Sequence, residues 1–319
     1  MSDTTLPRAS SFWDCEAVSP THNSWMAHPE IRSYINESIS GSPHKWPIDW
    51  FVDWLAGRRF KRALSVGCGT GPLERDLIQR DLCEFVDAFD GSSESLRIAR
   101  DMAREAGVDQ RINYYVADFN EPRLPSRTYD IVFFHQSAHH VSKLEKLYSA
   151  VLRSLKRNGL VYLDEYIGPS RFDWNDDLIA QHRQFYARIS PEARLQNPLS
   201  LPIHPIDPSE AIRSSEIISQ LTHGFRILEQ RNYGGSLLSV LFSAVDWTKE
   251  TSIDVADMIA VEKELLREGM PSYHAIIVAR PKRGVFRWYA LLRYFVAPKL
   301  RRVRWEVSKR VWRNREIKF

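Results

Sequence analysis

Residues 63–73 read Ala63-Leu64-Ser65-Val66-Gly67-Cys68-Gly69-Thr70-Gly71-Pro72-Leu73. A short, mostly apolar run ends in three alternating glycines, and a segment compatible with a helix, Pro72 to Gln79, follows at once. This order predicts a strand, a tight turn and the start of a helix. Because glycine tolerates positive φ angles and carries no Cβ, a ligand can lie directly against the backbone of such a turn. The stretch therefore indicates a ligand-binding loop in an α/β fold.

Strand-like and helix-like segments alternate between Lys61 and Ile167. Apolar runs predict strands at Ala63–Val66, Glu84–Asp90, Ile112–Val116, Tyr129–His135 and Leu160–Tyr166, and amphipathic patterns predict helices at Leu73–Arg80, Ser92–Ala106 and Leu144–Leu155. Strands that alternate with such helices are typical of a parallel sheet with helical crossovers. A less regular region follows, with further strands predicted at Phe225–Tyr233 and Tyr273–Ala279 and a helix at Ser209–His223.

Polar residues stand where the predicted strands end. Asp90 ends the second strand, Asp118 follows the third, His135 ends the fourth, and Asp164-Glu165 lies at the end of the fifth. In open parallel sheets, ligands bind outside the carboxyl ends of the strands. We therefore expect these residues to surround one site.

The spacing of the glycines and Asp90 favours a nucleoside ligand. Asp90 lies 21 residues after Gly69, where an acidic side chain can accept hydrogen bonds from both ribose hydroxyls. The alternative is that Asp90 caps the helix that follows it. The third glycine comes two residues after the second rather than three, which argues against the pyrophosphate cradle of a dinucleotide site.

Five motifs in order resemble those of the class I S-adenosylmethionine-dependent methyltransferases, in particular members that act on small molecules and glycans. They are Leu64-Ser-Val-Gly-Cys-Gly-Thr-Gly71, Phe89-Asp-Gly-Ser92, Val116-Ala-Asp-Phe119, Tyr129-Asp-Ile-Val-Phe133 and Ser154-Leu-Lys-Arg-Asn-Gly-Leu-Val161. The resemblance covers about Lys61 to Tyr166. It implies a Rossmann-like, doubly wound, mostly parallel seven-stranded sheet with helices on both faces, S-adenosylmethionine as the cofactor, and methyl transfer as the reaction.

The same resemblance assigns residues to the cofactor. They are Gly67, Cys68 and Gly69 for the methionine part, Asp90 and Gly91 for the ribose, Asp118 and Phe119 for adenine, and His135 and Gln136 beside the transferring methyl group. One position departs from the family, because Ser65 stands where an acidic residue is usual. Its hydroxyl could bond the cofactor's ammonium group without charge assistance, so we expect a weaker contact.

Methyl transfer from a sulfonium is an in-line displacement, so the protein chiefly aligns the acceptor and excludes water. If the acceptor is an alcohol, a histidine near its usual pKa suits the role of base. The candidates are His135, His139 and His140, although each could instead cap the strand or pack under the next helix. His139-His140-Val141 also resembles the "HH" segment of many small-molecule members of the family. Glu165 is a further candidate base that could instead bind backbone amides.

No metal site is predicted, because histidines, cysteines and carboxylates show no spacing along the chain that is typical of metal ligands. The alternative is that carboxylates from separate strands converge on an ion, so metal dependence stays open. Residues 1–57, rich in Trp, His and Pro, are interpreted as a helical N-terminal lid, and residues 58–281 as the methyltransferase domain. Within that domain, the less regular stretches at about 168–224 and 234–272 are expected to supply the acceptor pocket. Residues 282–319 form a basic, amphipathic, helical tail.

From Arg280 to Phe319 the chain has 14 Lys and Arg against two Glu, a net charge of +12, whereas the rest of the chain carries −8. Apolar and aromatic residues are interspersed with these charges, so residues 285–315 favour binding to an anionic membrane surface. Nucleic-acid binding, or packing on the acidic body of the same or a second chain, are the alternatives. The sequence indicates no oligomeric state.

Met1 to Ser10 has no apolar segment typical of a secretory signal, and Cys15, Cys68 and Cys83 form no metal-like pair. We therefore expect a cytoplasmic protein, attached peripherally to the inner membrane face through its tail. The predicted function is methylation of an oxygen of a small-molecule, glycan-type or lipid-linked acceptor, with S-adenosylmethionine as donor. An RNA methyltransferase that uses the basic tail for binding, and a cofactor-binding scaffold without turnover, are the alternatives.

Overall fold

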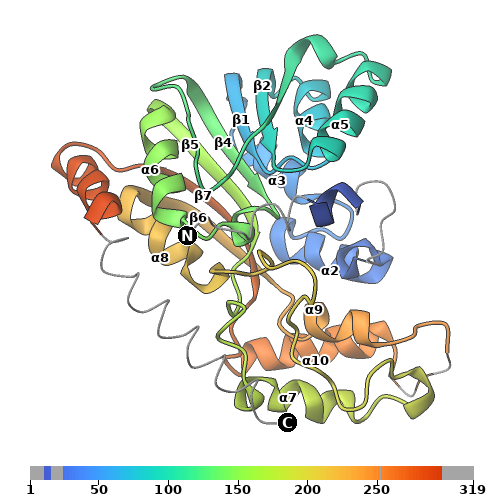
Figure 1. Ribbon diagram of the computed structural model, residues 1–319. Coiled ribbons are helices and arrows are strands. Elements are labelled where there is room, and N and C mark those ends of the chain that lie inside the picture. Colours follow the sequence, from blue (N-terminus) through green and yellow to red (C-terminus); the bar gives the residue numbers. More distant parts are fainter. Residues whose placement is uncertain (1–10, 16–23, 250, 252, 297–319) are drawn as a thin grey trace.

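The computed structural model describes residues 11–15, 24–249, 251 and 253–296. Its centre is a seven-stranded sheet in the order β3-β2-β1-β4-β5-β7-β6 (Figure 1). The strands are β1 (Phe60–Val66), β2 (Cys83–Asp90), β3 (Ile112–Val116), β4 (Tyr129–His135), β5 (Leu155–Tyr166), β6 (Phe225–Gly234) and β7 (His274–Pro281). β7 runs antiparallel to both of its neighbours, whereas β1 to β5 pair in parallel. The predicted mostly parallel, Rossmann-like sheet is confirmed.

Helices cover both faces of the sheet, as predicted. One face carries α2 (Pro29–Ser40), α3 (Pro47–Trp54), α4 (Pro72–Gln79) and α5 (Ser93–Glu105); the other carries α6 (Leu144–Ser154), α8 (Ile217–Gly224) and a helix at residues 285–296. Three more helices, α7 (Asp176–Tyr186), α9 (Leu238–Leu241) and α10 (Val255–Arg267), are grouped beyond the sheet (Figure 1). Short 3-10 turns lie at Trp25–Ala27, Asp109–Arg111, Ala138–His140, Pro191–Ala193, Ser214–Glu216 and Phe242–Ala244.

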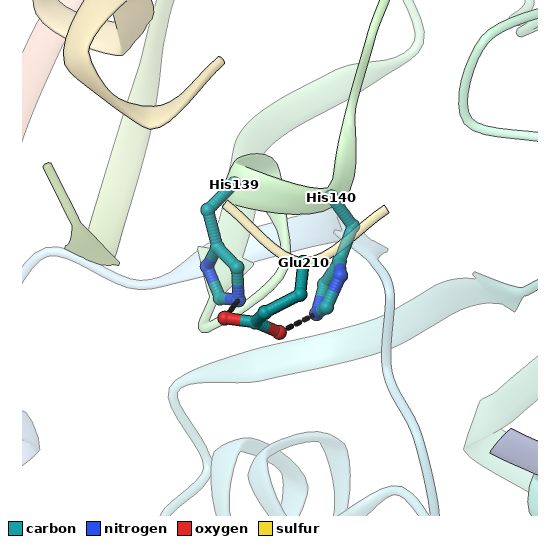
Figure 2. Close-up of side chains that lie close together, drawn as sticks. All are labelled: His139, His140 and Glu210. Carbon is teal, nitrogen blue, oxygen red and sulfur yellow. Dashed lines mark ion pairs between the residues drawn. The ribbon is translucent and has the colours of Figure 1, made fainter. Parts of the chain in front are cut away.

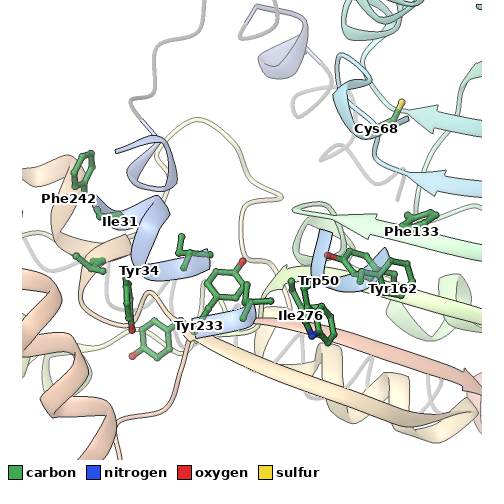
Figure 3. Close-up of a cluster of buried hydrophobic side chains, with 14 of the residues drawn as sticks. Ile31, Tyr34, Trp50, Cys68, Phe133, Tyr162, Tyr233, Phe242 and Ile276 are labelled. Carbon is green, nitrogen blue, oxygen red and sulfur yellow. The ribbon is translucent and has the colours of Figure 1, made fainter. Parts of the chain in front are cut away.

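The core explains why the strands read as continuous apolar runs. Phe51 of α3 packs on Tyr162 of β5 at 4.6 Å between ring centroids, and both rings lie against Phe133 of β4. Figure 3 shows Tyr162 and Phe133 within this cluster of buried side chains. The opposite face buries a second set of side chains beneath α6 and α8. A strand that is covered on both faces has no solvent-facing side, so its sequence shows no alternation of polar and apolar residues.

The helix predicted at Ser209–His223 is wrong in its first half. The chain makes a turn and a short 3-10 segment, Ser214–Glu216, and only then enters α8. Serine hydroxyls in this stretch bond elsewhere: that of Ser209 donates to Asp207, and that of Ser214 donates to the carbonyl of Gly168. The first bond is a local one that competes with helix formation, and the second ties the segment to the chain after β5. The irregular segment leaves Glu210 free to face the end of β4.

The helix at residues 285–296 has one face on the protein and one in solvent. Arg287 donates to the carbonyl of Leu152 at 2.7 Å, and the hydroxyl of Tyr294 donates to the carbonyl of Gln220 at 2.8 Å. Large apolar side chains point outward: Val285, Phe286, Trp288, Tyr289, Leu292, Phe295 and Val296. Across the described residues, every helix is too short or too polar to cross a membrane. The rest of the predicted tail, 297–319, lies outside the described residues.

Candidate functional site

The glycine turn between β1 and α4 presents bare backbone to the site. Gly67 and Gly69 both have positive φ angles, +70° and +53°. A Cβ on Gly67 would lie 2.5 Å from the Cβ of Ser137, whereas nothing lies within 4 Å of a Cβ on Gly69. Gly67 is therefore required by close packing, and Gly69 leaves open space against the backbone where a ligand can lie.

Asp90 ties the glycine turn to the end of β2. One carboxylate oxygen accepts a hydrogen bond from the amide of Gly69 at 2.9 Å, and the other accepts one from the amide of Ser92 at 2.8 Å. The N-cap of α5 is Ser92, whose hydroxyl accepts from the amide of Ser95. The alternative that Asp90 caps this helix is therefore wrong. Each carboxylate oxygen keeps a lone pair for a further donor such as a ribose hydroxyl.

The residues predicted to bind adenine lie beside the same turn. The ring of Phe119 packs on Phe89 at 5.6 Å and lies 3.4 Å from the Cβ position of Gly67. Asp118 accepts a hydrogen bond from the amide of Asn120 at 2.7 Å, which orders the loop after β3. The structure therefore brings the loops after β1, β2 and β3 together, as their predicted positions at strand ends require.

Glu74 is a site residue that the sequence reasoning missed. It lies in the first turn of α4 and is fully buried, and neither carboxylate oxygen has a hydrogen-bond partner among the described residues. Burial raises the pKa of Glu74, while the Ser65 hydroxyl and His135 act in the opposite direction. The available signal was periodicity, because Glu74 precedes the buried Leu77 and Ile78 by three and four residues.

His135 and Gln136 stand at the end of β4, facing Asp164 at the end of β5. The Nε2 atom of His135 lies 3.8 Å from Asp164, and its side chain is 48% exposed. Gln136 has a positive φ of +52° and donates to the hydroxyl of Tyr233 at 3.2 Å. That hydroxyl donates to Asp164 at 2.6 Å. His135 is thus the accessible imidazole of the three that were predicted as bases.

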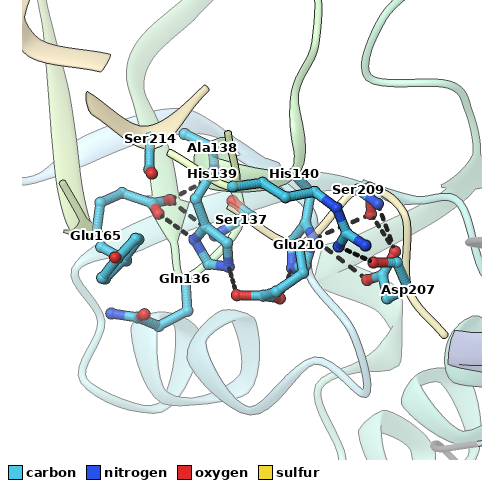
Figure 4. Close-up of polar contacts among 12 residues, drawn as sticks. Gln136, Ser137, Ala138, His139, His140, Glu165, Asp207, Ser209, Glu210 and Ser214 are labelled. Carbon is cyan, nitrogen blue, oxygen red and sulfur yellow. Dashed lines mark hydrogen bonds and ion pairs between the residues drawn. The ribbon is translucent and has the colours of Figure 1, made fainter. Parts of the chain in front are cut away.

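Glu165 holds the chain that follows β4. One oxygen accepts from the amides of Ser137 and Ala138 at 2.7 and 2.6 Å, and the other contacts Nδ1 of His139 at 2.9 Å (Figure 4). Its side chain is completely buried. This geometry matches the alternative in which Glu165 binds backbone amides, and it makes Glu165 a positioning group rather than a base that reaches a substrate.

His139 and His140 converge on Glu210, a residue that no sequence pattern singled out. The two Nε2 atoms lie 3.9 and 3.7 Å from the two oxygens of the Glu210 carboxylate (Figure 2). Burial lowers the pKa of His139, but Glu210 and Glu165 outweigh it and raise the value to about 8. Burial and the neighbouring His139 lower the pKa of His140. These three residues form the only candidate metal-ligand group within the described part of the chain.

Residues 11–15 form a short helical segment across the site. The indole of Trp13 donates to Asp207 at 3.0 Å and meets the ring of His140 edge-on at 5.3 Å. Asp14 accepts from the hydroxyl of Ser92 at 2.6 Å and from the amide of Glu94 at 3.0 Å. The segment therefore bridges the cofactor side of the site and the stretch 168–224 on its other side.

Comparisons with known proteins agree with this geometry. Residues 64–163 match the family described as "Methyltransferase domain" (Methyltransf_11). The fold is similar to that of geranyl diphosphate C-methyltransferase from Streptomyces coelicolor A3(2), with 15% identity, a TM-score of 0.52, and coverage of 89% of this chain and 99% of that one. Residues 64–163 therefore form a methyltransferase domain. The similar structure holds S-adenosyl-L-homocysteine, which is S-adenosylmethionine without its methyl group, so this domain implies S-adenosylmethionine as the cofactor.

Curated relatives share less of the chain. A sterol 24-C-methyltransferase of Clavispora lusitaniae is 25% identical over 123 residues, 39% of this chain and 32% of that protein. A ubiquinone biosynthesis O-methyltransferase of Aeromonas salmonicida is 28% identical over 116 residues, 36% of this chain and 48% of that protein. The matched segments thus span about a third to a half of the length of these relatives.

Proposed function

We propose that this chain transfers the methyl group of S-adenosylmethionine to an oxygen of a small-molecule acceptor. The observation that carries the proposal is the half-exposed imidazole of His135 at the end of β4, with Asp164 at 3.8 Å, beside the glycine turn that would hold the cofactor. An accessible base at the methyl end of the cofactor is what an alcohol or phenol acceptor requires. The relatives named above act on sterols, ubiquinone precursors and geranyl diphosphate, all small molecules.

The residues present fit the cofactor. The open backbone at Gly69 can receive the methionine part, and Asp90 has lone pairs for the ribose hydroxyls. Glu74 would supply the carboxylate that is missing at Ser65. Its ionised form is costly to bury without a hydrogen bond, so Glu74 holds a proton more readily than usual, and the ammonium group of the cofactor would stabilise the ionised form instead. Phe119 would lie against adenine, and Asp118 would accept from its amino group.

Bound S-adenosylmethionine supplies an electrophilic methyl group on a sulfonium. In the proposed reaction the acceptor oxygen forms a bond to that methyl carbon as the carbon–sulfur bond breaks, which leaves the cofactor as a neutral thioether. His135 takes the proton of the acceptor hydroxyl, and Asp164 stabilises the resulting imidazolium. Alignment and exclusion of water do the remaining work.

We propose that the acceptor lies between the strand ends and residues 168–224, under residues 11–15. Trp13 and Asp14 contact opposite sides of the site, so their release would open it. This arrangement supports a lid at the N-terminal end of the chain. If the segment acts as a lid, Trp13→Ala should speed the release of S-adenosylhomocysteine, measured by stopped-flow fluorescence, without lowering the melting temperature.

We further propose that the helix at residues 285–296 docks on an anionic membrane at the cytoplasmic face. Its outward face carries seven exposed large apolar side chains, among them Trp288 and Phe295 at 77% and 72%. Beside it, Arg280 and Arg283 line a hollow together with Arg58 and Arg157. Aromatic groups next to clustered arginines suit an interface of acyl chains and anionic headgroups. Tethering in this way would suit a lipid-linked or glycan-type acceptor.

Labelled product analysis tests the function. The full chain is incubated with methyl-labelled S-adenosylmethionine and a small-molecule extract, and the labelled product is fragmented to locate the methyl group. We expect a methyl ether, with turnover lost in His135→Asn and retained in His44→Asn, an exposed control. Methyl on carbon would overturn the oxygen assignment, labelled RNA would favour the nucleic-acid alternative, and cofactor binding without transfer would indicate a scaffold.

A further inference from the structure

We propose that His139, His140 and Glu210 form a binding site for a divalent transition-metal ion on the acceptor side of the pocket. No metal site was predicted from the sequence, because Glu210 is far from the two histidines along the chain. The structure brings it next to them through the irregular segment that replaces the first half of the predicted helix Ser209–His223. The suggested role of the ion in binding the acceptor rests on the proposed function; the binding of the ion itself does not.

The geometry is that of a set of ligands rather than a hydrogen-bonded cluster. Both Nε2 atoms point at the carboxylate of Glu210 (Figure 2), yet their distances of 3.9 and 3.7 Å are too long for hydrogen bonds. An ion about 2.1 Å from each ligand separates ligand atoms by about 3.0 to 3.5 Å. All of the ligand atoms lie within 4.8 Å of one another. Small movements of the two imidazoles and of Glu210, whose side chain is 35% exposed, would bring them to the distances that an ion requires.

Both imidazole rings are oriented by contacts at their Nδ1 atoms. The Nδ1 atom of His139 lies 2.9 Å from the buried carboxylate of Glu165, and Nδ1 of His140 lies 3.1 Å from the hydroxyl of Ser209 and 3.5 Å from Asp207 (Figure 4). When Nδ1 carries the proton, Nε2 presents its lone pair to the site. Metal-binding histidines in proteins are oriented in this manner, by a carboxylate or another acceptor on the second nitrogen.

The local charge also favours a cation. Glu165, Asp207 and Glu210 surround the two rings, and the ion pairs that they form within the described residues are to these histidines. Arg171 interacts with Asp207 and Glu210 and supplies one positive charge. The raised pKa of His139 means that its imidazole holds a proton while no ion is bound. An ion that binds Nε2 displaces this proton, and two negative charges then remain to be balanced in a largely buried setting. A divalent ion balances them.

The donor set selects the class of ion. Two imidazole nitrogens and one carboxylate suit Zn²⁺, Co²⁺, Fe²⁺ or Mn²⁺ better than Mg²⁺ or Ca²⁺, which prefer oxygen ligands. Three protein ligands leave at least one coordination position open, as in sites that bind a substrate. Glu210 is 35% exposed and belongs to the stretch 168–224 that we propose as one wall of the acceptor pocket. An open coordination position there would suit an acceptor hydroxyl, carboxylate or carbonyl oxygen.

Binding of Co²⁺ to the full chain, freed of metal with a chelator and without S-adenosylmethionine, tests the site. We expect one equivalent, seen by calorimetry and by the visible absorption of the bound ion. Glu210→Gln and His140→Asn should weaken binding at least tenfold. The control Glu192→Gln, an exposed carboxylate in the same 168–224 stretch, should bind as the unmodified chain does.

Glu210→Gln is the decisive variant, because its partly exposed side chain can be exchanged without opening the core. Circular dichroism checks that each variant is folded. Binding that is absent in the unmodified chain, or equal in all variants, would overturn the proposal. Methyl transfer that continues at full rate in excess chelator would remove the role of the ion and leave the proposed function intact. Specific Co²⁺ binding without any methyl transfer would overturn the proposed function and leave the metal site in place.

Discussion

Gly67 lies directly against Ser137, so that β1 and the chain after β4 meet at the glycine turn. A Cβ on Gly67 would come within 2.5 Å of the Cβ of Ser137, and the hydroxyl of Ser137 donates to the carbonyl of Val66 at 2.6 Å. Glu165 fixes Ser137 from the other side through its amide. The glycine turn and the segment with His139 and His140 are therefore one packed unit. A substitution in either segment should alter the position of the other.

Gly67→Ala should destabilise the fold by about 2–4 kcal/mol, because it forces a clash with Ser137 and places a side chain at positive φ. Urea denaturation measures this change. Gly91→Ala is the matched control, since nothing lies within 4 Å of its Cβ position and its φ is not positive. Equal free energies of unfolding for the two variants would show that the close contact between Gly67 and Ser137 does not determine the cost of a side chain at residue 67.

Glu74→Gln should weaken S-adenosylmethionine binding by about tenfold to a hundredfold, the value of one hydrogen bond to a charged group. Burial raises the pKa of Glu74 above its unfolded value, so its ionisation disfavours folding as the pH rises past about 4.5. The variant should therefore melt higher than the unmodified, unliganded chain at pH 7 but not at pH 4.

Calorimetry measures the affinity and thermal melts measure the stability. Asp76→Asn serves as the control, because Asp76 is a partly exposed carboxylate on the same helix, paired with Arg80. An unchanged dissociation constant in Glu74→Gln would remove Glu74 from the cofactor site, whatever its effect on stability.

Replacing Trp288 and Phe295 by serine should lower binding to anionic vesicles at least tenfold, since each buried aromatic side chain contributes about 1.5–3 kcal/mol. Co-sedimentation with phosphatidylglycerol vesicles measures this, and added salt should weaken binding further. Tyr115→Ser, at an exposed aromatic residue of β3, should bind normally. Absence of vesicle binding by the unmodified chain contradicts the proposal. If the unmodified chain is a dimer and the serine replacements make it monomeric, the outward face of the helix at residues 285–296 binds a second copy of the chain instead.

His274 should make the fold sensitive to acid. Burial, together with His139, lowers the pKa of His274 to about 3, so the folded chain keeps it neutral while the unfolded chain protonates it below about 6.5. Stability is therefore lost as the pH falls from about 6.5 toward 3. Between pH 6.5 and 5 this loss is about 2 kcal/mol.

Urea denaturation at pH 7.5 and pH 5 measures this loss. His274→Gln should show a smaller difference between the two pH values than the unmodified chain, even if its stability at pH 7.5 is lower. His44→Gln, at an exposed histidine, should keep the full difference. An undiminished difference in His274→Gln would assign the acid sensitivity to other groups.

The sequence by itself determined the sheet, the glycine turn and the positions of Asp90 and Asp118. The strands predicted at Ile112–Val116 and Tyr129–His135 have the bounds seen in the structure, and the others differ at their ends. These features depend on local patterns: apolar runs define strands, and parallel strands with helical crossovers put their carboxyl ends on one edge. No knowledge of distant contacts is needed for either.

Only the tertiary structure decided how Glu74 and Glu210 face the site. Glu74 is one residue of an ordinary helix, and its buried, unpartnered carboxylate becomes visible only when α4 is packed on the sheet. Glu210 lies in a segment without periodicity, placed by long-range bonds such as that from the amide of Ile212 to the carbonyl of His139. The side-chain direction in such a segment follows from distant partners rather than neighbours in sequence, so local patterns could not reveal it.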